Sequence, residues 1–305
     1  MSASRLSTFN LETWTARQLA DVEAALGRWV ACPQLSPAPA GLGDAMRYAV
    51  LDGGKRLRPL LVMASCEAVG GNPQAAMRSA CAVELIHAYS LVHDDMPCMD
   101  NDVLRRGKPT VHVQYGQAQA LLAGDALQAL AFEILTPEDG SVDAATQARL
   151  CRMLAQAAGH QGMAGGQAID LASVGKPLTS EELHGMHRLK TGALLQASVR
   201  MGAACGSPTD AARQALLDYG AAIGLAFQVV DDILDVVADS ATLGKTAGKD
   251  AAQDKPTFVS LMGLQASQAY AQKLLADAHR SLSASGLQHT QALAALADML
   301  VNRGS

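Results

Sequence analysis

Apolar residues recur every three or four positions along nearly every long segment of this chain. Between residues 77 and 92, and again between 213 and 237, this spacing places the apolar side chains on one face of a helix. The apolar positions are Cys81, Leu85, Ala88 and Val92 in the first segment and Leu216, Ile223, Phe227 and Val230 in the second. The pattern predicts that the protein is built almost entirely from helices.

Short polar, glycine-rich or proline-rich segments separate the predicted helices. A capping box at Thr179 and Glu182 predicts a helix start, and the run from Gly70 to Pro73 predicts a helix end. The breaks fall at 32–41, 69–74, 136–141, 175–180, 205–210 and 239–257. No fixed repeat and no long linker divides the chain. We therefore expect one all-α domain over residues 1–305 with ten or more helices, in which residues 1–40 form an N-terminal helix and a Pro-rich loop.

The composition supports helices and narrows the classes of partner. Hydrophobic residues make up 49% of the chain but aromatic residues only 4%, so the apolar content comes mainly from good helix formers such as Ala, Leu and Met. This argues against an all-β protein and against disorder. The formal net charge of −5 gives the chain no general attraction to nucleic acid or anionic lipid.

The cysteines and the N-terminus favour a reducing, cytoplasmic setting. The six cysteines are scattered, and none lies at zinc-binding spacing from another cysteine or a histidine. The first residues lack the apolar core of a secretory signal, and no uncharged apolar run is long enough to span a membrane. We expect reduced, mostly buried thiols and a cytoplasmic protein.

Four carboxylates crowd the end of the apolar helix predicted before residue 94. Asp94, Asp95, Asp100 and Asp102 fall within nine residues, and such close negative charges repel one another unless a cation lies between them. Oxygen ligands of this kind suit a hard divalent cation. A solvated acidic helix end is the alternative, and it is the commoner explanation for one such cluster alone. An EF-hand is excluded because the required Gly and closing Glu are missing.

A second acidic cluster changes the balance between these two interpretations. Asp231, Asp232 and Asp235 follow Gln228 at offsets of three, four and seven, so all four side chains share one helical stripe. The stripe interrupts an apolar sequence and contains no Lys or Arg, unlike an ordinary solvated face. Two such clusters on apolar helices are typical of two walls around a metal-containing cavity.

Basic residues near both clusters indicate what the metals would hold. Lys55, Arg56 and Arg58 follow the glycine pair at 53–54, and Arg105, Arg106 and Lys108 follow the first acidic cluster. The second half of the chain adds Lys190, Lys245, Lys249 and Lys255 around the second cluster. Acidic clusters for Mg²⁺ together with separate cations indicate polyphosphate binding. The sequence contains no P-loop or dinucleotide-binding glycine motif. His87 lies two helical turns before Asp94, where a phosphate contact and an ordinary core role are both open.

In this order, the motifs resemble the signatures of the trans-isoprenyl diphosphate synthases. The motifs are Gly-Gly-Lys-Arg-Leu-Arg-Pro at 53–59, the acidic run from Asp94 followed by Leu-Arg-Arg-Gly, Lys-Thr-Gly-Ala at 190–193, and Gln-Val-Val-Asp-Asp-Ile-Leu-Asp at 228–235. The resemblance extends from about residue 41 to Arg303. It is strongest to bacterial farnesyl diphosphate synthases, including the two inserted residues Pro97 and Cys98.

The resemblance implies a role for individual residues. The six aspartates of the two motifs (Asp94, Asp95, Asp100, Asp231, Asp232 and Asp235) would bind about three Mg²⁺ ions that bridge the allylic diphosphate. Isopentenyl diphosphate would be held by Lys55, Arg58, His87 and Arg106. The allylic diphosphate would contact Arg105, Lys190, Lys245 and Lys255, while Thr191 and Gln228 line the reacting carbon. Tyr89 and Ser90 would set the product chain length.

The same resemblance implies the fold and the reaction. The fold would be an antiparallel helical bundle around a central cavity, in a homodimer. The reaction would be a Mg²⁺-dependent condensation of isopentenyl diphosphate with dimethylallyl or geranyl diphosphate to (2E,6E)-farnesyl diphosphate.

Three other assignments have to be weighed against this one. A geranylgeranyl or geranyl diphosphate synthase would use the same fold. A terpene cyclase would normally carry Asn, Ser and Glu in its second metal motif. A non-catalytic regulatory subunit would have lost metal-binding aspartates, and here both sets are complete.

Overall fold

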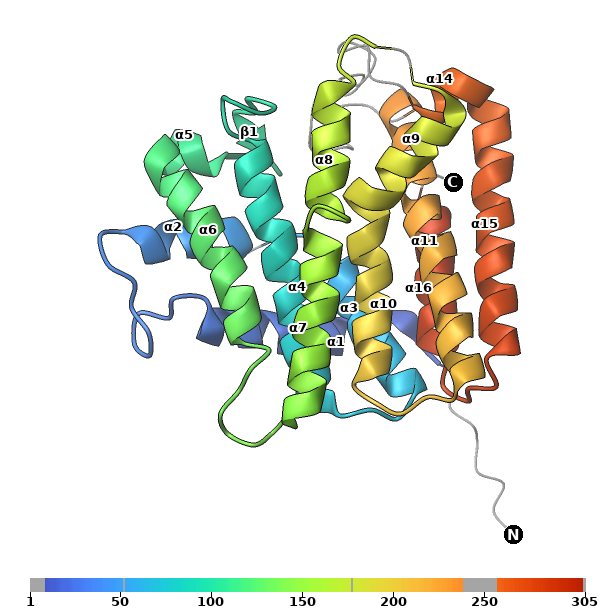
Figure 1. Ribbon diagram of the computed structural model, residues 1–305, viewed down its shortest axis with the longest axis horizontal. Helices are drawn as coiled ribbons and strands as arrows, with labels where there is room; N and C mark the ends of the chain where they lie inside the picture. Colours follow the sequence, from blue (N-terminus) through green and yellow to red (C-terminus); the bar gives the residue numbers. More distant parts are fainter. Residues whose placement is uncertain (1–8, 52, 177, 238–256, 304–305) are drawn as a thin grey trace.

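The computed structural model describes residues 9–51, 53–176, 178–237 and 257–303, and these residues are mainly helical (Figure 1). The expectation of an all-α fold is confirmed. The helices are α1 (Leu11–Trp29), α2 (Leu42–Val50), α3 (Leu57–Ala68), α4 (Pro73–Asp94), α5 (Val111–Tyr115), α6 (Gln117–Glu133), α7 (Ala144–Ala158), α8 (Met163–Ala172), α9 (Ser180–His187), the π-helix η1 (Arg188–Gly192), α10 (Ala193–Ala204), α11 (Asp210–Val237), α14 (Phe258–Met262), α15 (Leu264–Ala284) and α16 (Gln291–Val301).

The helix ends follow the capping signals in the sequence. Asn72 caps α4 by accepting hydrogen bonds from the backbone N–H groups of Gln74 and Ala75, and Pro73 occupies the first helical position. Thr179 and Glu182 form the predicted capping box at the start of α9. These caps satisfy backbone donors that would otherwise lack partners at a helix start.

The long helices α4, α6, α10, α11 and α15 run alongside one another, and α1 crosses them (Figure 1). Helix α4 is central to the packing, because it contacts α3 and α6 and also packs on α10. Its buried residues lie all round the helix axis, as expected for a helix that is covered on every side. Both its position and its C-terminal end at Asp94 matter for the site described below.

A β-hairpin with two residues in each strand follows α4, and the apolar pattern did not predict this hairpin. Strand β1 (Leu104–Arg105) pairs antiparallel with β2 (Lys108–Pro109), and Arg105 lies opposite Lys108. The two turn residues, Arg106 and Gly107, both have positive φ angles, as a tight hairpin turn requires. The hairpin thereby presents two consecutive arginines beside the end of α4. In the described part of the chain, no helix combines the length and apolarity needed to cross a bilayer.

Candidate active site

Two cavities adjoin each other along α4. The first has a volume of about 660 Å³ and the second about 380 Å³. Arg58, His87 and Leu91 line both of them. These side chains from α3 and α4 therefore form the boundary between the two cavities.

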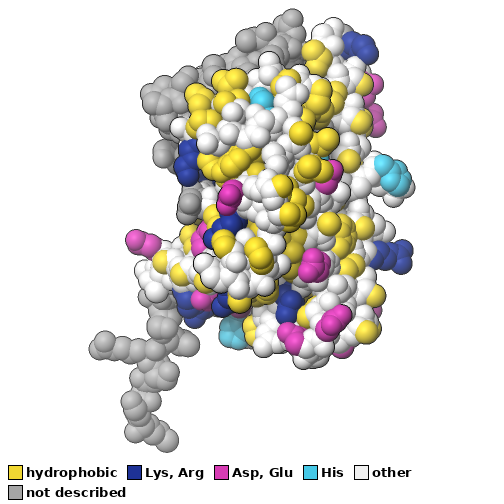
Figure 2. All heavy atoms as spheres, turned by 90° about the vertical axis from the view of Figure 1, so that its left-hand side faces the viewer, with side chains coloured by type: hydrophobic (Ala, Val, Ile, Leu, Met, Phe, Trp, Pro, Cys, Tyr) yellow, Lys and Arg dark blue, Asp and Glu magenta, His cyan; other side chains and the backbone are white. Residues whose placement is uncertain are grey.

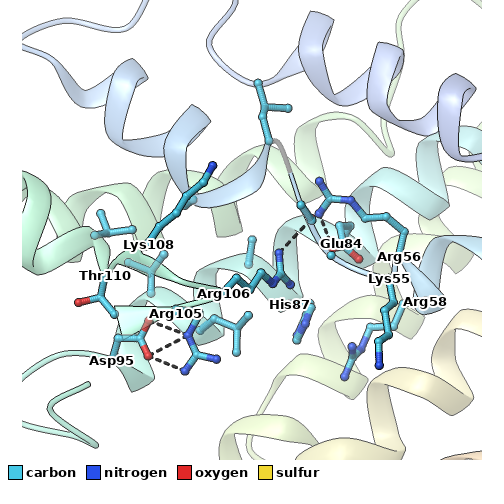
Figure 3. A pocket seen from close by; sticks show the side chains of 18 of the residues that line it. Lys55, Arg56, Arg58, Glu84, His87, Asp95, Arg105, Arg106, Lys108 and Thr110 are labelled. Carbon is cyan, nitrogen blue, oxygen red and sulfur yellow. Dashed lines mark hydrogen bonds and ion pairs between the residues drawn. The ribbon is translucent and has the colours of Figure 1, made fainter. Parts of the chain in front are cut away.

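Cations from three separate segments line the first cavity (Figure 3). Lys55 lies in the loop before α3 and Arg58 lies in the first turn of α3, while Arg106 comes from the hairpin. The Arg58 Nε atom is buried, and it has no hydrogen-bond partner among the described residues. A buried guanidinium atom without a partner costs free energy unless an anion satisfies it. This cavity is therefore suited to a phosphate group.

His87 faces this set of cations from α4. Its pKa lies well below the usual range, first because the ring is buried and then because Arg58 and Arg106 are close. The imidazole is consequently neutral at pH 7. A neutral ring retains one N–H donor, so His87 can donate one hydrogen bond to an anion without adding charge.

Both hairpin arginines already have partners in the protein. Arg105 Nε lies 2.8 and 2.9 Å from the two carboxylate oxygens of Asp95, and its Nη2 donates to Asp95 Oδ1 at 2.5 Å. Arg106 Nη1 donates to the carbonyl oxygen of Gly53 at 2.9 Å. The first bond set fixes Arg105 on the first aspartate motif, and the second ties the hairpin to the loop that carries Lys55 (Figure 3).

The first aspartate motif begins at the end of α4. The backbone N–H of Asp100 donates to the Asp94 carbonyl oxygen at 2.8 Å, which folds the loop back on the helix end. The pKa of Asp94 is raised to about 6, mainly by burial, with the negative charges of Asp100 and Asp95 adding to the effect against Lys190 and Arg105. A desolvated carboxylate with acidic neighbours is the environment that a divalent cation would relieve.

The second aspartate motif lies on α11, which also contacts η1. Asp232 is buried and accepts hydrogen bonds from Gln228 Nε2 at 2.7 Å and from the Phe258 backbone N–H at 2.8 Å. Gln228 Oε1 in turn accepts a hydrogen bond of 3.1 Å from the Thr191 hydroxyl. Asp231 lines the first cavity, and its charge raises the pKa of Lys55 and Arg58 against the dominant effect of burial.

Lys190 lies on the π-helix η1, together with Thr191. Its Nζ atom donates to Asp170 Oδ2 at 2.6 Å, and both Lys190 and Thr191 line the second cavity with Asp94. A π-helical turn is an uncommon conformation that is frequent at functional sites. The apolar period of the sequence could not distinguish it from an α-helix.

The residues present fit a set of magnesium ions bound together with a polyphosphate. No group of three or more acidic, histidine or cysteine side chains in the described ranges is close enough to hold an ion without further ligands. Asp94 lines the second cavity and Asp231 lines the first, and the two residues come from different helices. Mg²⁺ takes few protein ligands and completes its shell with phosphate and water oxygens. A bound diphosphate would supply those oxygens.

The second cavity extends below Asp94 along α4. Tyr89, Ser90 and His93 line it from that helix, and Met163 and Gln167 line it from α8. The Tyr89 ring packs edge-to-face on the His93 ring, with 5.7 Å between the ring centroids. The Ser90 hydroxyl donates to the His87 carbonyl oxygen at 2.9 Å. Tyr89 is thus the largest side chain lining this part of the cavity.

Some residues of the cavities were not predicted from the sequence, and some predicted residues cannot be placed. Glu84 and Arg303 line the first cavity, and Asp170 pairs with Lys190. No motif marks these three residues, and only the spatial contacts reveal them. Lys245 and Lys255 lie outside the described residues, so their predicted contacts with the allylic diphosphate stay predictions.

The chain is similar in sequence to several known proteins. The family described as "Polyprenyl synthetase" matches residues 39–296. The chain is 48% identical over 285 residues to the farnesyl diphosphate synthase of Escherichia coli, covering 92% of this chain and 94% of that protein. It is 43% identical over 296 residues to the chloroplastic geranylgeranyl pyrophosphate synthase of Capsicum annuum, covering 97% of this chain and 79% of that protein.

A solved structure has the same fold over almost its whole length. The crystal structure of an FPP/GFPP synthase from Zymomonas mobilis superposes with a TM-score of 0.84 at 42% sequence identity, covering 96% of this chain and 99% of that one.

Proposed function

The chain belongs to the polyprenyl synthetase family, and we propose that it condenses isopentenyl diphosphate with dimethylallyl and geranyl diphosphates to (2E,6E)-farnesyl diphosphate. The predicted resemblance is confirmed, and the protein is a prenyltransferase. The observation that carries the proposed reaction is the pair of adjoining cavities. One is lined by cations from three segments, and the other is bounded by Asp94 and Lys190 and narrowed by Tyr89.

We propose that isopentenyl diphosphate binds in the first cavity. Lys55, Arg58 and Arg106 supply the positive charge, and neutral His87 donates a hydrogen bond. The buried Arg58 Nε atom supports this assignment, since a diphosphate oxygen would satisfy it. The double bond of the same substrate then points along α4 toward the boundary that Arg58, His87 and Leu91 form with the second cavity.

The allylic diphosphate belongs between the two aspartate motifs in this proposal. Asp94, Asp95 and Asp100 on one side and Asp231, Asp232 and Asp235 on the other would hold about three Mg²⁺ ions, which neutralise the charge of the departing diphosphate. Arg105 and Lys190 are positioned for that diphosphate by Asp95 and Asp170. Lys245 and Lys255 complete the proposed set.

The reacting carbon is left as a cation when the carbon–oxygen bond to diphosphate breaks. Thr191 donates its hydroxyl proton to Gln228, so the lone pairs of its oxygen remain available to the electron-poor carbon. Such fixed dipoles stabilise developing charge better than mobile water does. The apolar walls exclude water, which would otherwise capture the cation. The isopentenyl double bond then attacks, and the departed diphosphate is the nearest base for the proton that is lost.

We also propose that the protein acts as a homodimer. Large apolar side chains are exposed on α5 and α6, where Val113, Leu121 and Leu122 are 47–52% exposed. Figure 2 faces the side of the molecule where these helices lie and shows hydrophobic side chains spread over its surface. An apolar surface of this kind is typical of a subunit interface, and a second copy of the chain is the partner that the resemblance implies.

Turnover with purified protein tests the proposal and separates it from its alternatives. We expect Mg²⁺-dependent consumption of isopentenyl and dimethylallyl diphosphates, loss of turnover with a chelator, and a fifteen-carbon main product. A product of ten or twenty carbons would identify the geranyl or geranylgeranyl synthase instead. No turnover by the purified chain, with activity restored by a second prenyl synthase subunit, would identify the regulatory subunit.

A further inference from the structure

Arg56 lies between Lys55 and Arg58 in the sequence and lines the same cavity, but its guanidinium is bound by carboxylates from α1 and α4. Its side chain is 2% exposed. Nε donates to Glu23 Oε1 and Nη1 donates to Glu84 Oε1, both at 2.7 Å, and Nη2 donates to the Val50 carbonyl oxygen at 2.5 Å. One guanidinium therefore joins α1, the end of α2 and α4 to the start of α3.

Stability alone is a weak explanation for this arrangement. Taking an ion pair out of water costs much of what the attraction returns, and apolar residues of similar size are often as stabilising. What a guanidinium held by three acceptors provides is a fixed direction. Arg56 also has a φ angle of 47°, a left-handed conformation that a residue with a side chain adopts only when its surroundings hold it there.

This conformation determines where the neighbouring cations point. At the turn made by Arg56, Lys55 and Arg58 extend in one direction in Figure 3, while the Arg56 guanidinium extends toward Glu84. Glu84 lies three residues before His87 on α4, so the two side chains share one helical face. The Arg56–Glu84 pair thus fixes the loop that carries Lys55 against α4, the helix that carries His87.

Arg56 also changes the electrostatic potential inside the cavity. Glu84 lines the first cavity, and its side chain is only 4% exposed. A buried carboxylate without a cation would repel a diphosphate strongly, because little water screens it. The Arg56 guanidinium, which lines the same cavity, pairs with this carboxylate, so that the other cations of the cavity, Lys55, Arg58 and Arg106 among them, can attract the diphosphate.

We propose that Arg56, acting through Glu84, is a positioning residue for the isopentenyl diphosphate site. It holds the loop so that Lys55 and Arg58 converge on the diphosphate, and it neutralises Glu84 without contacting the substrate itself. The inference rests on the proposed function, since it concerns the substrate of the first cavity.

The paired variant Arg56→Met/Glu84→Met separates positioning from folding. It replaces the buried pair by apolar side chains of similar length, a change that proteins often tolerate without loss of stability. We expect the melting temperature to stay close to that of the wild type. The KM for isopentenyl diphosphate should rise at least tenfold, while the KM for dimethylallyl diphosphate stays within twofold. Calorimetric titration with isopentenyl diphosphate alone should show the same loss of affinity.

Two further variants complete the test. Arg78→Met removes an arginine from α4, the helix that carries Glu84. Arg78 donates hydrogen bonds to the Ile134 carbonyl oxygen at 3.1 Å and to Asp139 at 3.0 Å. This variant should lower stability without changing either KM. Arg56→Lys keeps the positive charge beside Glu84 but cannot reproduce the three directed hydrogen bonds of the guanidinium, and it gives the same test should the paired variant not fold. We expect it to raise the KM for isopentenyl diphosphate about threefold.

The outcomes distinguish this inference from the proposed function. A folded paired variant, or Arg56→Lys, that binds isopentenyl diphosphate as tightly as the wild type would overturn the positioning role. An equal rise in both KM values would also overturn it, because that is the result of a general structural defect. If the wild type itself does not bind isopentenyl diphosphate, or if Arg58→Ala binds it normally, the proposed function fails instead.

Discussion

Lys190 Nζ donates a hydrogen bond of 2.6 Å to Asp170 Oδ2, joining the π-helix η1 to α8. The Asp170 side chain is 9% exposed and that of Lys190 28% exposed, so the pair is largely shielded from water. Lys190 also lowers the pKa of Asp94, partly opposing the effect of burial. The lysine proposed for the allylic diphosphate is therefore oriented by a carboxylate from a neighbouring helix.

Asp170→Asn should weaken use of the allylic substrate. Asparagine keeps the shape and an oxygen acceptor for Lys190 but loses the negative charge, so the charge-assisted hydrogen bond becomes weaker. We expect kcat/KM for dimethylallyl diphosphate to fall several-fold and the KM for isopentenyl diphosphate to stay within twofold. Asp139→Asn is a matched control, because its ion pair with Arg78 is at the surface and contributes little. Equal kinetics for the two variants would contradict the orienting role.

The pKa of Asp94 makes the stability of the metal-free protein depend on pH. Because this pKa is raised to about 6 from 3.8, the folded protein holds a proton that the unfolded chain releases between these values. The free energy of unfolding should therefore fall as the pH rises from about 4 to about 6. Urea unfolding at a series of pH values measures this, and Asp94→Asn should flatten the dependence.

Adding Mg²⁺ with pyrophosphate should reverse this loss above pH 6. The bound cations would compensate the ionised Asp94, and a ligand that binds only the folded state stabilises it. Chelating the metal should restore the metal-free profile. An Asp94→Asn variant that keeps the full slope between pH 4 and 6 would show that another group causes it.

Removing a charged ligand from either aspartate motif should stop the reaction without unfolding the protein. For Asp94→Asn and Asp231→Asn we expect kcat to fall at least about 10²-fold, since losing one such electrostatic contact costs about 2.7–4 kcal/mol. Far-UV circular dichroism should be unchanged. Turnover close to that of the wild type in either variant would mean that the substituted aspartate is not needed as a metal ligand.

The parts of the site that are contiguous in the sequence could be predicted, and those made by distant segments could not. The apolar period identified α4 and α11. The first aspartate motif begins at the end of α4, and the aspartates of the second motif share one stripe of α11. By contrast, Arg56 meets Glu23 and Glu84 only after three helices have packed together. The same is true of Lys190 and Asp170, because nothing in one sequence shows which charges will be neighbours.

The pattern of apolar residues also could not predict two local backbone features, the π-helix η1 and the β-hairpin. The period of three or four residues is shared by α-helical and π-helical turns, so it could not reveal η1 at Arg188–Gly192. The hairpin has only two residues in each strand, too few for an alternating pattern. Lys190 lies on η1 and Arg105 lies in the hairpin, so only the structure shows the backbone conformation at these two residues.

Product length should depend on Tyr89, which narrows the second cavity below Asp94. Tyr89 lies five positions before Asp94, which places their Cα atoms about 7.5 Å apart along the helix axis. We expect the wild type to stop mainly at fifteen carbons and Tyr89→Ala to shift the product to twenty carbons or more, because removing the ring lengthens the cavity. The Mg²⁺ requirement should not change. Chromatography of the dephosphorylated products measures the distribution.

Gly124 should affect product length in the opposite direction, through His93. The His93 Nε2 atom lies 3.1 Å from the Leu121 carbonyl oxygen on α6, and a Cβ atom at Gly124 would lie only 2.1 Å from that nitrogen. In Gly124→Ala the imidazole must therefore move away from α6, toward the Tyr89 ring and the cavity that both side chains line. We expect a larger ten-carbon fraction, and Gly185→Ala is the control because a Cβ there meets no atom within 4 Å. A Gly124→Ala product distribution identical to that of the control would mean that the position of the His93 ring does not affect product length, whatever the outcome of Tyr89→Ala.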